Sequence, residues 1–248
     1  MTDPRASRNS VQSGSVHALV LLGGAAPTRA GLDASWPGWD AGADEVIAAD
    51  AGLAIGPGLG LEPTLLVGDL DSLDPSLAAA AEAAGLPVRR FPVAKDETDA
   101  ELALLESVAH GATRITVLGW SGGARLDHAL ANTWLLAHPA LAEADVVLLD
   151  ATCRVTLLQA PATDGGPAVR HLPGPTGAIV SLLPFGGDAD GVTTRGLRYP
   201  LDDEVLVTGP ARGVSNVRDA ADASVTLRRG RLLVVEIALA ESGLSSPS

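Results

Sequence analysis

Apolar runs and helix-like segments alternate along the first 150 residues of the chain. Short apolar runs predict buried strands at 16–22, 45–49, 64–67, 88–91, 114–118 and 145–149. Alanine- and leucine-rich segments predict helices at 75–84, 99–110 and 127–138, each followed directly by glycine or proline. Strands that alternate with helices in this way are typical of a parallel, doubly wound sheet.

The pattern changes after residue 150. Brief strands are predicted at 154–159, 178–183, 204–208, 224–228 and 232–237, with glycine and proline turns between them and a helical period only at 220–223. Such a segment is typical of a small antiparallel sandwich. We therefore predict an α/β fold in two domains: a doubly wound, mostly parallel sheet at 15–150 and an antiparallel β-sandwich at 151–240.

Composition and charge narrow the possible partners. Acidic residues outnumber basic ones 30 to 17, and the net charge of −13 argues against a nucleic-acid or anionic-membrane surface. The single cysteine, Cys153, excludes an internal disulfide. Apolar runs are too short to span a bilayer, and none follows Arg5 and Arg8 as a signal peptide would require. We expect a cytoplasmic protein, with residues 1–14 and the tail from Ser242 disordered.

The most informative motif is Gly68-Asp69-Leu70-Asp71-Ser72, which follows the strand at 64–67. In a parallel sheet, this end of a strand opens into the ligand crevice. Two carboxylates so close together repel each other unless a cation lies between them. Mg²⁺ is commonly bound by one or two carboxylates, with phosphate oxygens completing its shell. The motif therefore predicts metal-assisted chemistry on a phosphorylated substrate.

Further acids follow other predicted strands: Asp50, the segment Asp96-Glu97-Thr98-Asp99, and Asp127. Because the loops of a doubly wound sheet converge on one side, these carboxylates could surround a single ion. Each alone also has a structural explanation, as a turn residue, a helix cap or a carboxylate that suits the helix dipole. Five acids at successive strand ends favour the metal site over five separate structural roles.

A glycine-rich turn at 119–123 is a second candidate for phosphate binding. Glycines let backbone N–H groups approach a phosphate, and Arg125 behind the turn can bind one through two hydrogen bonds. Lys95 is a second cation that would face the same crevice. A plain flexible turn and solvated surface charges are the alternatives.

Histidine and tryptophan residues add less to the prediction of a functional site. His128 lies beside Asp127 at a helix start and is best explained as a structural histidine. Trp36 and Trp39 flank a Pro-Gly turn and could either pack or contact a ligand, whereas Trp134 has the spacing of a packing residue.

Seven segments of the chain match one known family, in the right order. They are Ala49-Asp50-Ala51-Gly52, Gly68-Asp69-Leu70-Asp71-Ser72, Lys95-Asp96-Glu97-Thr98-Asp99, Gly122-Gly123-Ala124-Arg125-Leu126-Asp127-His128, Ser181-Leu182-Leu183-Pro184, Gly196-Leu197-Arg198-Tyr199-Pro200-Leu201 and Gly213-Val214-Ser215-Asn216. In these segments the chain resembles the thiamine pyrophosphokinase (thiamine diphosphokinase) family, over about residues 16–238.

The resemblance implies an N-terminal α/β catalytic domain, a C-terminal β-sandwich and a homodimer. It implies that ATP and Mg²⁺ bind the acidic loops, and that thiamine lies near the subunit interface, contacted by Ser215 and Asn216. The thiamine hydroxyl would attack the β-phosphorus of ATP, giving thiamine diphosphate and AMP. This chain departs from the usual family pattern at Leu70, where an aromatic residue is usual, and at Ala51, where glycine is usual. It also has no tryptophan after Trp134.

These arguments together assign a role to each candidate residue. The predicted metal ligands are Asp69, Asp71 and Asp99. The predicted catalytic residues are Asp71, Asp99, Arg125 and Asp127, with Asp127 orienting the hydroxyl or accepting its proton. The predicted ATP-binding residues are Asp50, Gly52, Lys95, Thr98, Ser121, Gly122 and Gly123. The predicted thiamine-binding residues are Ser215 and Asn216.

Two other functions remain open at this point. One is a pyrophosphokinase for another alcohol, such as a hydroxymethylpterin, against which the pair Ser215-Asn216 argues. The other is a protein that binds a nucleotide or thiamine without turnover, against which the five acids and Arg125 argue.

Overall fold

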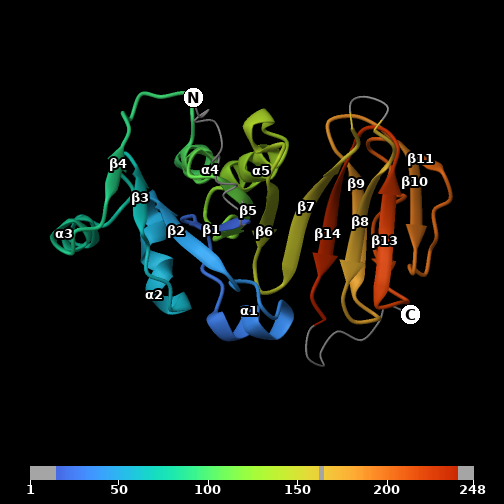
Figure 1. Ribbon diagram of the computed structural model, residues 1–248, viewed down its shortest axis with the longest axis horizontal. Coiled ribbons are helices and arrows are strands. Elements are labelled where there is room, and N and C mark those ends of the chain that lie inside the picture. The colour runs from blue at the N-terminus through green and yellow to red at the C-terminus, as the bar shows by residue number, and fades with distance from the viewer. Residues whose placement is uncertain (1–14, 162–164, 240–248) are drawn as a thin grey trace, which may run out of the picture.

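The computed structural model describes residues 15–161 and 165–239, and its strands form two sheets (Figure 1). The larger sheet has ten strands in the order β12-β9-β14-β7-β6-β5-β1-β2-β3-β4. Its parallel half contains β1 (Val16–Leu21), β2 (Ala43–Ala49), β3 (Leu65–Gly68), β4 (Val88–Arg90), β5 (Ala112–Leu118) and β6 (Asp145–Leu149). The strand order reverses between β1 and β5, and this switch point is where a doubly wound sheet binds its ligand.

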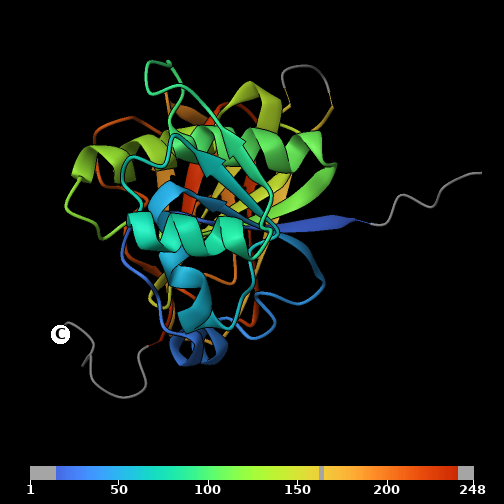
Figure 2. The same ribbon diagram turned by 90° about the vertical axis from the view of Figure 1, so that its left-hand side faces the viewer.

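Helices cover both faces of the parallel half, because its strands are apolar on both sides. Ala18 and Val20 of β1 pack in one core with α4 (Asp99–Ala109), whereas Leu19 and Leu21 pack in a second core with α1 (Arg29–Ser35). Figure 2 shows these layers, with α4 and α5 in green above the sheet and α1 in blue below it. The other helical segments are η1 (Asp50–Ile55), α2 (Gly56–Leu59), α3 (Pro75–Ala83), α5 (Leu126–Leu135) and η2 (Pro139–Leu141).

The second half of the chain forms a sandwich that shares the larger sheet. Strands β7 (Cys153–Gln159), β14 (Arg231–Ile237), β9 (Ile179–Pro184) and β12 (Asn216–Val217) continue that sheet, because β7 pairs antiparallel with β6. The facing sheet contains β11 (Glu204–Leu206), β10 (Ala189–Arg195), β13 (Asp222–Leu227) and β8 (Ala168–Pro173). Alternate strand residues such as Leu182, Val234 and Val225 fill the core between the two sheets.

The predicted fold class is confirmed, with several local differences. The helical period predicted at 220–223 is wrong, because residues 220–221 form a turn and residues 222–223 begin β13. The apolar pattern did not reveal α1, β8 or β10. Strand β8 carries Arg170 and His171, and β10 carries glycine and threonine, so neither shows the apolar run of a buried strand.

Some predictions concern residues that the structure does not describe. The disorder predicted for residues 1–14 and for the tail from Ser242 lies outside the described residues. Among the residues 15–161 and 165–239, no helix has the length and apolar character that crossing a membrane requires.

Candidate active site

Three carboxylates meet at the carboxyl ends of neighbouring strands. Asp50 follows β2, Asp69 follows β3, and Asp99 begins α4. One carboxylate oxygen from each lies within 4.8 Å of the others. The sequence predicted this convergence, although Asp50 was assigned to ATP rather than to the metal. The sharp turn after β3 carries Leu70 at a positive φ of 65°, and the Asp69 carboxylate accepts a hydrogen bond from the Asp71 N–H at 3.1 Å.

Lys95 lies against two of these acids. Its Nζ atom is 3.0 Å from Asp69 Oδ2 and 3.0 Å from Asp99 Oδ1. Burial opposes the charge on the lysine, but the hydrogen bonds to Asp69 and Asp99 outweigh it and raise the pKa of Lys95. The pKa of Asp69 is lowered, first by the hydrogen bond from the Asp71 N–H and then by Lys95. Both groups therefore stay ionised at neutral pH.

Asp50 is the acid that Lys95 does not neutralise. Its side chain is buried, and its Oδ1 atom has no hydrogen-bond partner among the described residues. Burial, followed by the negative charge of Asp99, raises the pKa of Asp50. Three acids with one lysine leave an excess of negative charge, and a buried oxygen without a partner costs free energy. Oxygen donors arranged in this way fit a hard divalent cation.

The third predicted metal ligand, Asp71, lies outside this group of three. Its side chain is exposed, and its Oδ1 atom accepts a hydrogen bond from the Ser72 hydroxyl at 2.9 Å. The structure thus brings together Asp69 and Asp99 with Asp50, and leaves Asp71 outside this group. A role for Asp71 in metal binding or catalysis stays a prediction.

A cleft of about 480 Å³ opens beside the acid cluster, at the switch point of the sheet. Seven of the predicted site residues line it: Asp50, Lys95, Thr98, Asp99, Ser121, Gly123 and Arg125. Thr98 also caps α4, because its hydroxyl accepts a hydrogen bond from the Glu101 N–H at 3.1 Å. The cleft is large enough for a nucleotide-sized ligand, since small-molecule pockets span roughly 300–1,000 Å³.

Two of the predicted ATP-binding glycines, Gly52 and Gly122, allow the loops around the cleft to pack closely. A Cβ atom at Gly52 would lie 1.9 Å from the Leu21 carbonyl oxygen, so only glycine allows η1 to pack on the end of β1. A Cβ atom at Gly122 would lie 2.6 Å from Ala25 Cβ, and the φ of Gly122 is +75°. These glycines shape the loops, whether or not their backbone contacts a ligand.

Arg125 and Asp127 bind each other at the mouth of the cleft. Arg125 Nε donates to Asp127 Oδ1 at 2.8 Å, and both side chains are exposed. The hydrogen bond from Arg125 lowers the pKa of Asp127 to about 2. A carboxylate with so low a pKa is a weak base. In this arrangement Asp127 is better suited to orienting a group than to accepting a proton.

Ser215 and Asn216 lie far from the acid cluster of the same chain. Ser215 directly precedes β12 and Asn216 is its first residue. Strand β12 is separated from β2 by seven strand spacings, or roughly 34 Å at about 4.8 Å per spacing. The Asn216 side chain is buried and binds the backbone of Tyr199 twice, at 3.0 Å and 2.6 Å. Ser215 is exposed at a φ of 59°. One chain alone does not bring the predicted ATP and thiamine residues together.

Sequence reasoning gave no site role to several residues that line the cleft, among them Gly24 and Asn132. Gly24 lies so close to the turn after β5 that a Cβ atom would lie 2.3 Å from the Gly119 carbonyl oxygen. Asn132 donates to the Trp120 carbonyl at 2.8 Å, and the buried Trp120 Nε1 has no partner among the described residues. The spacing of Asn132 from His128, one helical turn, is a signal that could have revealed it.

The family model "Thiamin pyrophosphokinase, catalytic domain" matches residues 39–148, and "Thiamin pyrophosphokinase, vitamin B1 binding domain" matches residues 169–232. A curated thiamine pyrophosphokinase of Bacillus subtilis is 24% identical over 176 residues, which cover 71% of this chain and 79% of that protein.

Solved structures show the same fold. A thiamine pyrophosphokinase from Bacillus subtilis superposes with a TM-score of 0.74 at 23% identity, over 90% of this chain and 100% of that one. The yeast thiamin pyrophosphokinase gives a TM-score of 0.72 at 14% identity, over 91% of this chain and 87% of that one.

Proposed function

Because the chain belongs to the thiamin pyrophosphokinase family, we propose that it transfers a diphosphoryl group from ATP to the hydroxyl of thiamine. The products are thiamine diphosphate and AMP. The observation that carries this proposal is the pair of family models, one for the catalytic domain and one for the vitamin B1-binding domain, matched in order along the chain. ATP as donor also fits the predicted cytoplasmic location.

Asp50, Asp69 and Asp99 are the residues that would hold Mg²⁺. The partnerless oxygen of Asp50 and the excess negative charge of the cluster support this assignment. When bound, the ion would offset the charge of the phosphates and of the group in transfer. Lys95 fixes the carboxylates of Asp69 and Asp99 in place before any ligand arrives.

The remaining residues of the cleft bind and orient the substrates. Arg125 lines the cleft and can exchange its bond with Asp127 for two hydrogen bonds to a phosphate. The backbone at Ser121 and Gly123 is positioned to contact phosphate or adenosine. Because phosphoryl transfer proceeds through a loose transition state, positioning the hydroxyl matters more than removing its proton early. Asp127, whose pKa is lowered by Arg125 so that it stays ionised, would orient that hydroxyl.

A second copy of the chain would complete the site. Roughly 34 Å separate Ser215-Asn216 from the acid cluster in one chain, so thiamine contacted by both needs residues from two chains. Leu126, Leu130 and Trp134 form an apolar stripe on α5, with exposed fractions of 55–73%. A neighbouring side of the same helix lines the cleft with His128 and Asn132. A homodimer docked on this stripe would bring a partner's sandwich to the cleft.

The two alternative functions receive less support. A pterin pyrophosphokinase would not explain the match to a vitamin B1-binding domain. A protein that only binds its ligands would not need a lysine held between two ionised acids at the switch point.

An AMP-release assay separates the three functions. Purified protein is given ATP and Mg²⁺ with thiamine, with a hydroxymethylpterin, or with no acceptor, and an Asp99→Asn variant serves as the control. The proposal requires AMP release that depends on thiamine and is lost in the variant. Release with the pterin alone, or no release with any acceptor, would contradict it.

A further inference from the structure

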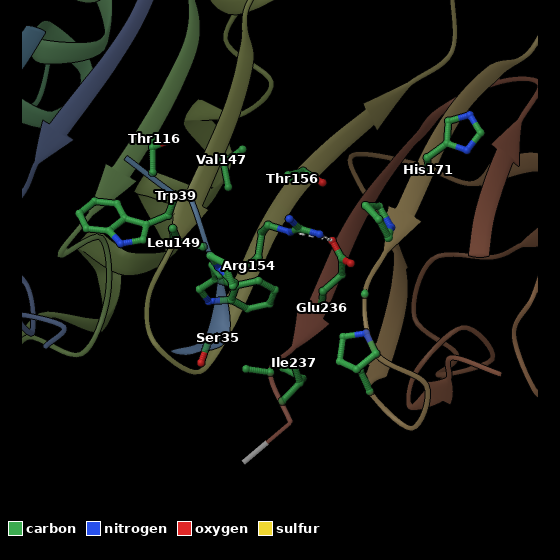
Figure 3. Close-up of a pocket in the computed structure, with 18 of the residues that line it drawn as sticks. Ser35, Trp39, Thr116, Val147, Leu149, Arg154, Thr156, His171, Glu236 and Ile237 are labelled. Carbon is green, nitrogen blue, oxygen red and sulfur yellow. Dashed lines mark hydrogen bonds and ion pairs between the residues drawn. The ribbon is translucent and has the colours of Figure 1, made fainter. Parts of the chain in front are cut away.

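A second hollow lies on the sheet, away from the catalytic cleft (Figure 3). Its floor is the face of β5, β6 and β7 that carries Thr116, Val147 and Thr156. The loop 35–39 after α1 forms one wall, and β8 with the turn at 173–175 forms the other. We call this hollow the arginine groove. It has a volume of about 520 Å³ and shares no lining residue with the catalytic cleft.

The arginine groove carries a local positive charge in an acidic protein. Four arginines line it, namely Arg114, Arg154, Arg170 and Arg218, against two acids, Asp145 and Glu236. Glu236 is shared, since Arg154 Nε is 2.9 Å from one of its oxygens and Arg218 Nη2 is 2.6 Å from the other. Asp145 pairs with Arg170 at 2.9 Å. Among the described residues Arg114 has no carboxylate partner. The lining therefore keeps an excess of two positive charges, whereas the chain carries −13.

Buried donors in the lining have no partner. Thr156 and Arg218 are each 2% exposed, yet Thr156 Oγ1 and Arg218 Nε make no hydrogen bond among the described residues. The Nε atom of Arg170 is in the same state. Buried polar groups normally have hydrogen-bond partners, because leaving a buried donor without one costs free energy. A ligand that supplies acceptor oxygens would satisfy these donors.

The size and the aromatic wall indicate an organic anion. A volume of about 520 Å³ falls within the roughly 300–1,000 Å³ of pockets for drug-sized ligands, and an inorganic anion would leave most of it empty. Trp36 forms part of the wall, with the Arg154 guanidinium 4.9 Å from its ring centroid. Val147, Leu149 and Ile237 add apolar surface. A flat ring system could pack there while a phosphate meets the arginines.

We propose that the arginine groove is a second, non-catalytic binding site for a heteroaromatic ligand that carries a phosphate. AMP and thiamine diphosphate, the products of the proposed reaction, both belong to this chemical class. The chemistry of the groove does not depend on that reaction, so the two proposals can be tested separately.

Indole N–H signals in an NMR titration distinguish the two sites. The chain has four tryptophans, and single Trp→Phe variants assign their signals. Trp36 and Trp39 line the arginine groove, Trp120 lines the catalytic cleft, and Trp134 lies on α5. The full-length protein is titrated separately with AMP, thiamine diphosphate, thiamine and inorganic phosphate, without assaying turnover.

We expect AMP or thiamine diphosphate to shift the Trp36 or Trp39 signal to saturation. Inorganic phosphate should bind at least tenfold more weakly, and thiamine, which has no phosphate, should leave these signals unmoved. Whichever phosphate ester binds more tightly identifies the source of the ligand. If both esters move only the Trp120 signal up to millimolar concentration, the arginine groove is not such a site.

Two variants test the contacts. Thr156→Val removes the partnerless hydroxyl at nearly constant shape, so the fold should keep or gain thermal stability while affinity at the groove falls several-fold. Arg114→Gln should weaken binding about tenfold, and Arg90→Gln, on β4, is the matched loss of one charge elsewhere. Wild-type affinity in both groove variants, or an equal loss in Arg90→Gln, would overturn the proposal.

Discussion

Asp50 is a buried carboxylate whose proposed role in metal binding would come at the expense of stability. Its raised pKa means that the folded chain binds a proton more tightly than the unfolded chain does. That contribution to stability is fully present below the pKa of the unfolded state, near 3.8, and is lost as pH rises through the folded pKa. At neutral pH without a divalent ion, the charged Asp50 therefore destabilises the fold.

Replacing Asp50 by asparagine should separate stability from metal binding. In metal-free protein at pH 7, Asp50→Asn should raise stability by about 1 kcal/mol, or roughly 2–4 °C in Tm. The advantage should shrink as pH falls through the raised pKa of Asp50, because the wild-type carboxylate then takes up a proton. Adding Mg²⁺ should raise the Tm of the wild type much more than that of the variant. Thermal melts across pH and Mg²⁺ test this, and an equal Mg²⁺ response in both proteins would remove Asp50 from the metal site.

Arg125 should matter for turnover far more than for folding. The side chain is exposed, and its pair with Asp127 lies on the surface, where such pairs contribute little to stability. Arg125→Lys keeps the charge but loses the two-pronged hydrogen bonding, so we expect kcat to fall by about 10–100-fold with Tm nearly unchanged. Steady-state kinetics with thermal melts measure both. A large fall in Tm with full activity per folded molecule would make Arg125 structural.

Ser215 and Asn216 should behave differently despite being neighbours. The buried Asn216 side chain makes two hydrogen bonds to the backbone of Tyr199 and so holds that segment against β12. Asn216→Ala should therefore cost about 2 kcal/mol of stability. Ser215 is exposed, so we expect its side chain to contribute little to the stability of the fold. Ser215→Ala should leave Tm unchanged and raise the KM for thiamine several-fold more than the KM for ATP. Equal rises in both KM values would place Ser215 outside a dedicated thiamine site.

At the scale of elements, the sequence predicted what long apolar runs determine. Strands β1, β5 and β6 were found because buried parallel strands are apolar on both faces. Strand β8 was missed because its residues alternate in exposure and include Arg170 in the arginine groove. The helical period of α5 was found, yet Trp134, predicted as a packing residue, is more than half exposed and contacts Phe185. The hydrophobic periodicity identified α5 as a helix. Which side of α5 is buried depends on the elements packed against it, which the periodicity does not encode.

The sequence predicted which residues gather at the candidate site, but not how they contact one another. Motif order placed Asp69 and Asp99 together at the strand ends, because strand ends in a doubly wound sheet converge. The position of Lys95 between them depends on the path of the loop 91–98, which no periodicity encodes. For the same reason, the separation of Asp71 from the cluster and the pairing of Arg125 with Asp127 became visible only in three dimensions.

The stripe on α5 makes a prediction for the whole molecule. Leu130→Glu should dissociate the proposed homodimer and lower activity, because it puts a charge in the apolar contact. Leu77→Glu is the matched control, since Leu77 lies exposed on α3, a helix with no buried residue. Light scattering and thiamine-dependent AMP release measure the two effects. A wild-type protein that is monomeric at micromolar concentration with full activity would contradict the assembly.

The shared ten-stranded sheet limits how the molecule can move. Backbone hydrogen bonds between β6 and β7 join the two halves, so bending at that junction would break a ladder in the middle of a sheet. Enzymes built as two separate lobes can close on a substrate by a hinge motion. Here the continuous sheet across β6 and β7 opposes such a motion. Opening and closing must be confined to loops at the strand ends, such as 91–98 and 119–125. We therefore expect access to the cleft to depend on these loops and, in the proposed homodimer, on the neighbouring subunit, rather than on the two halves of one chain moving together.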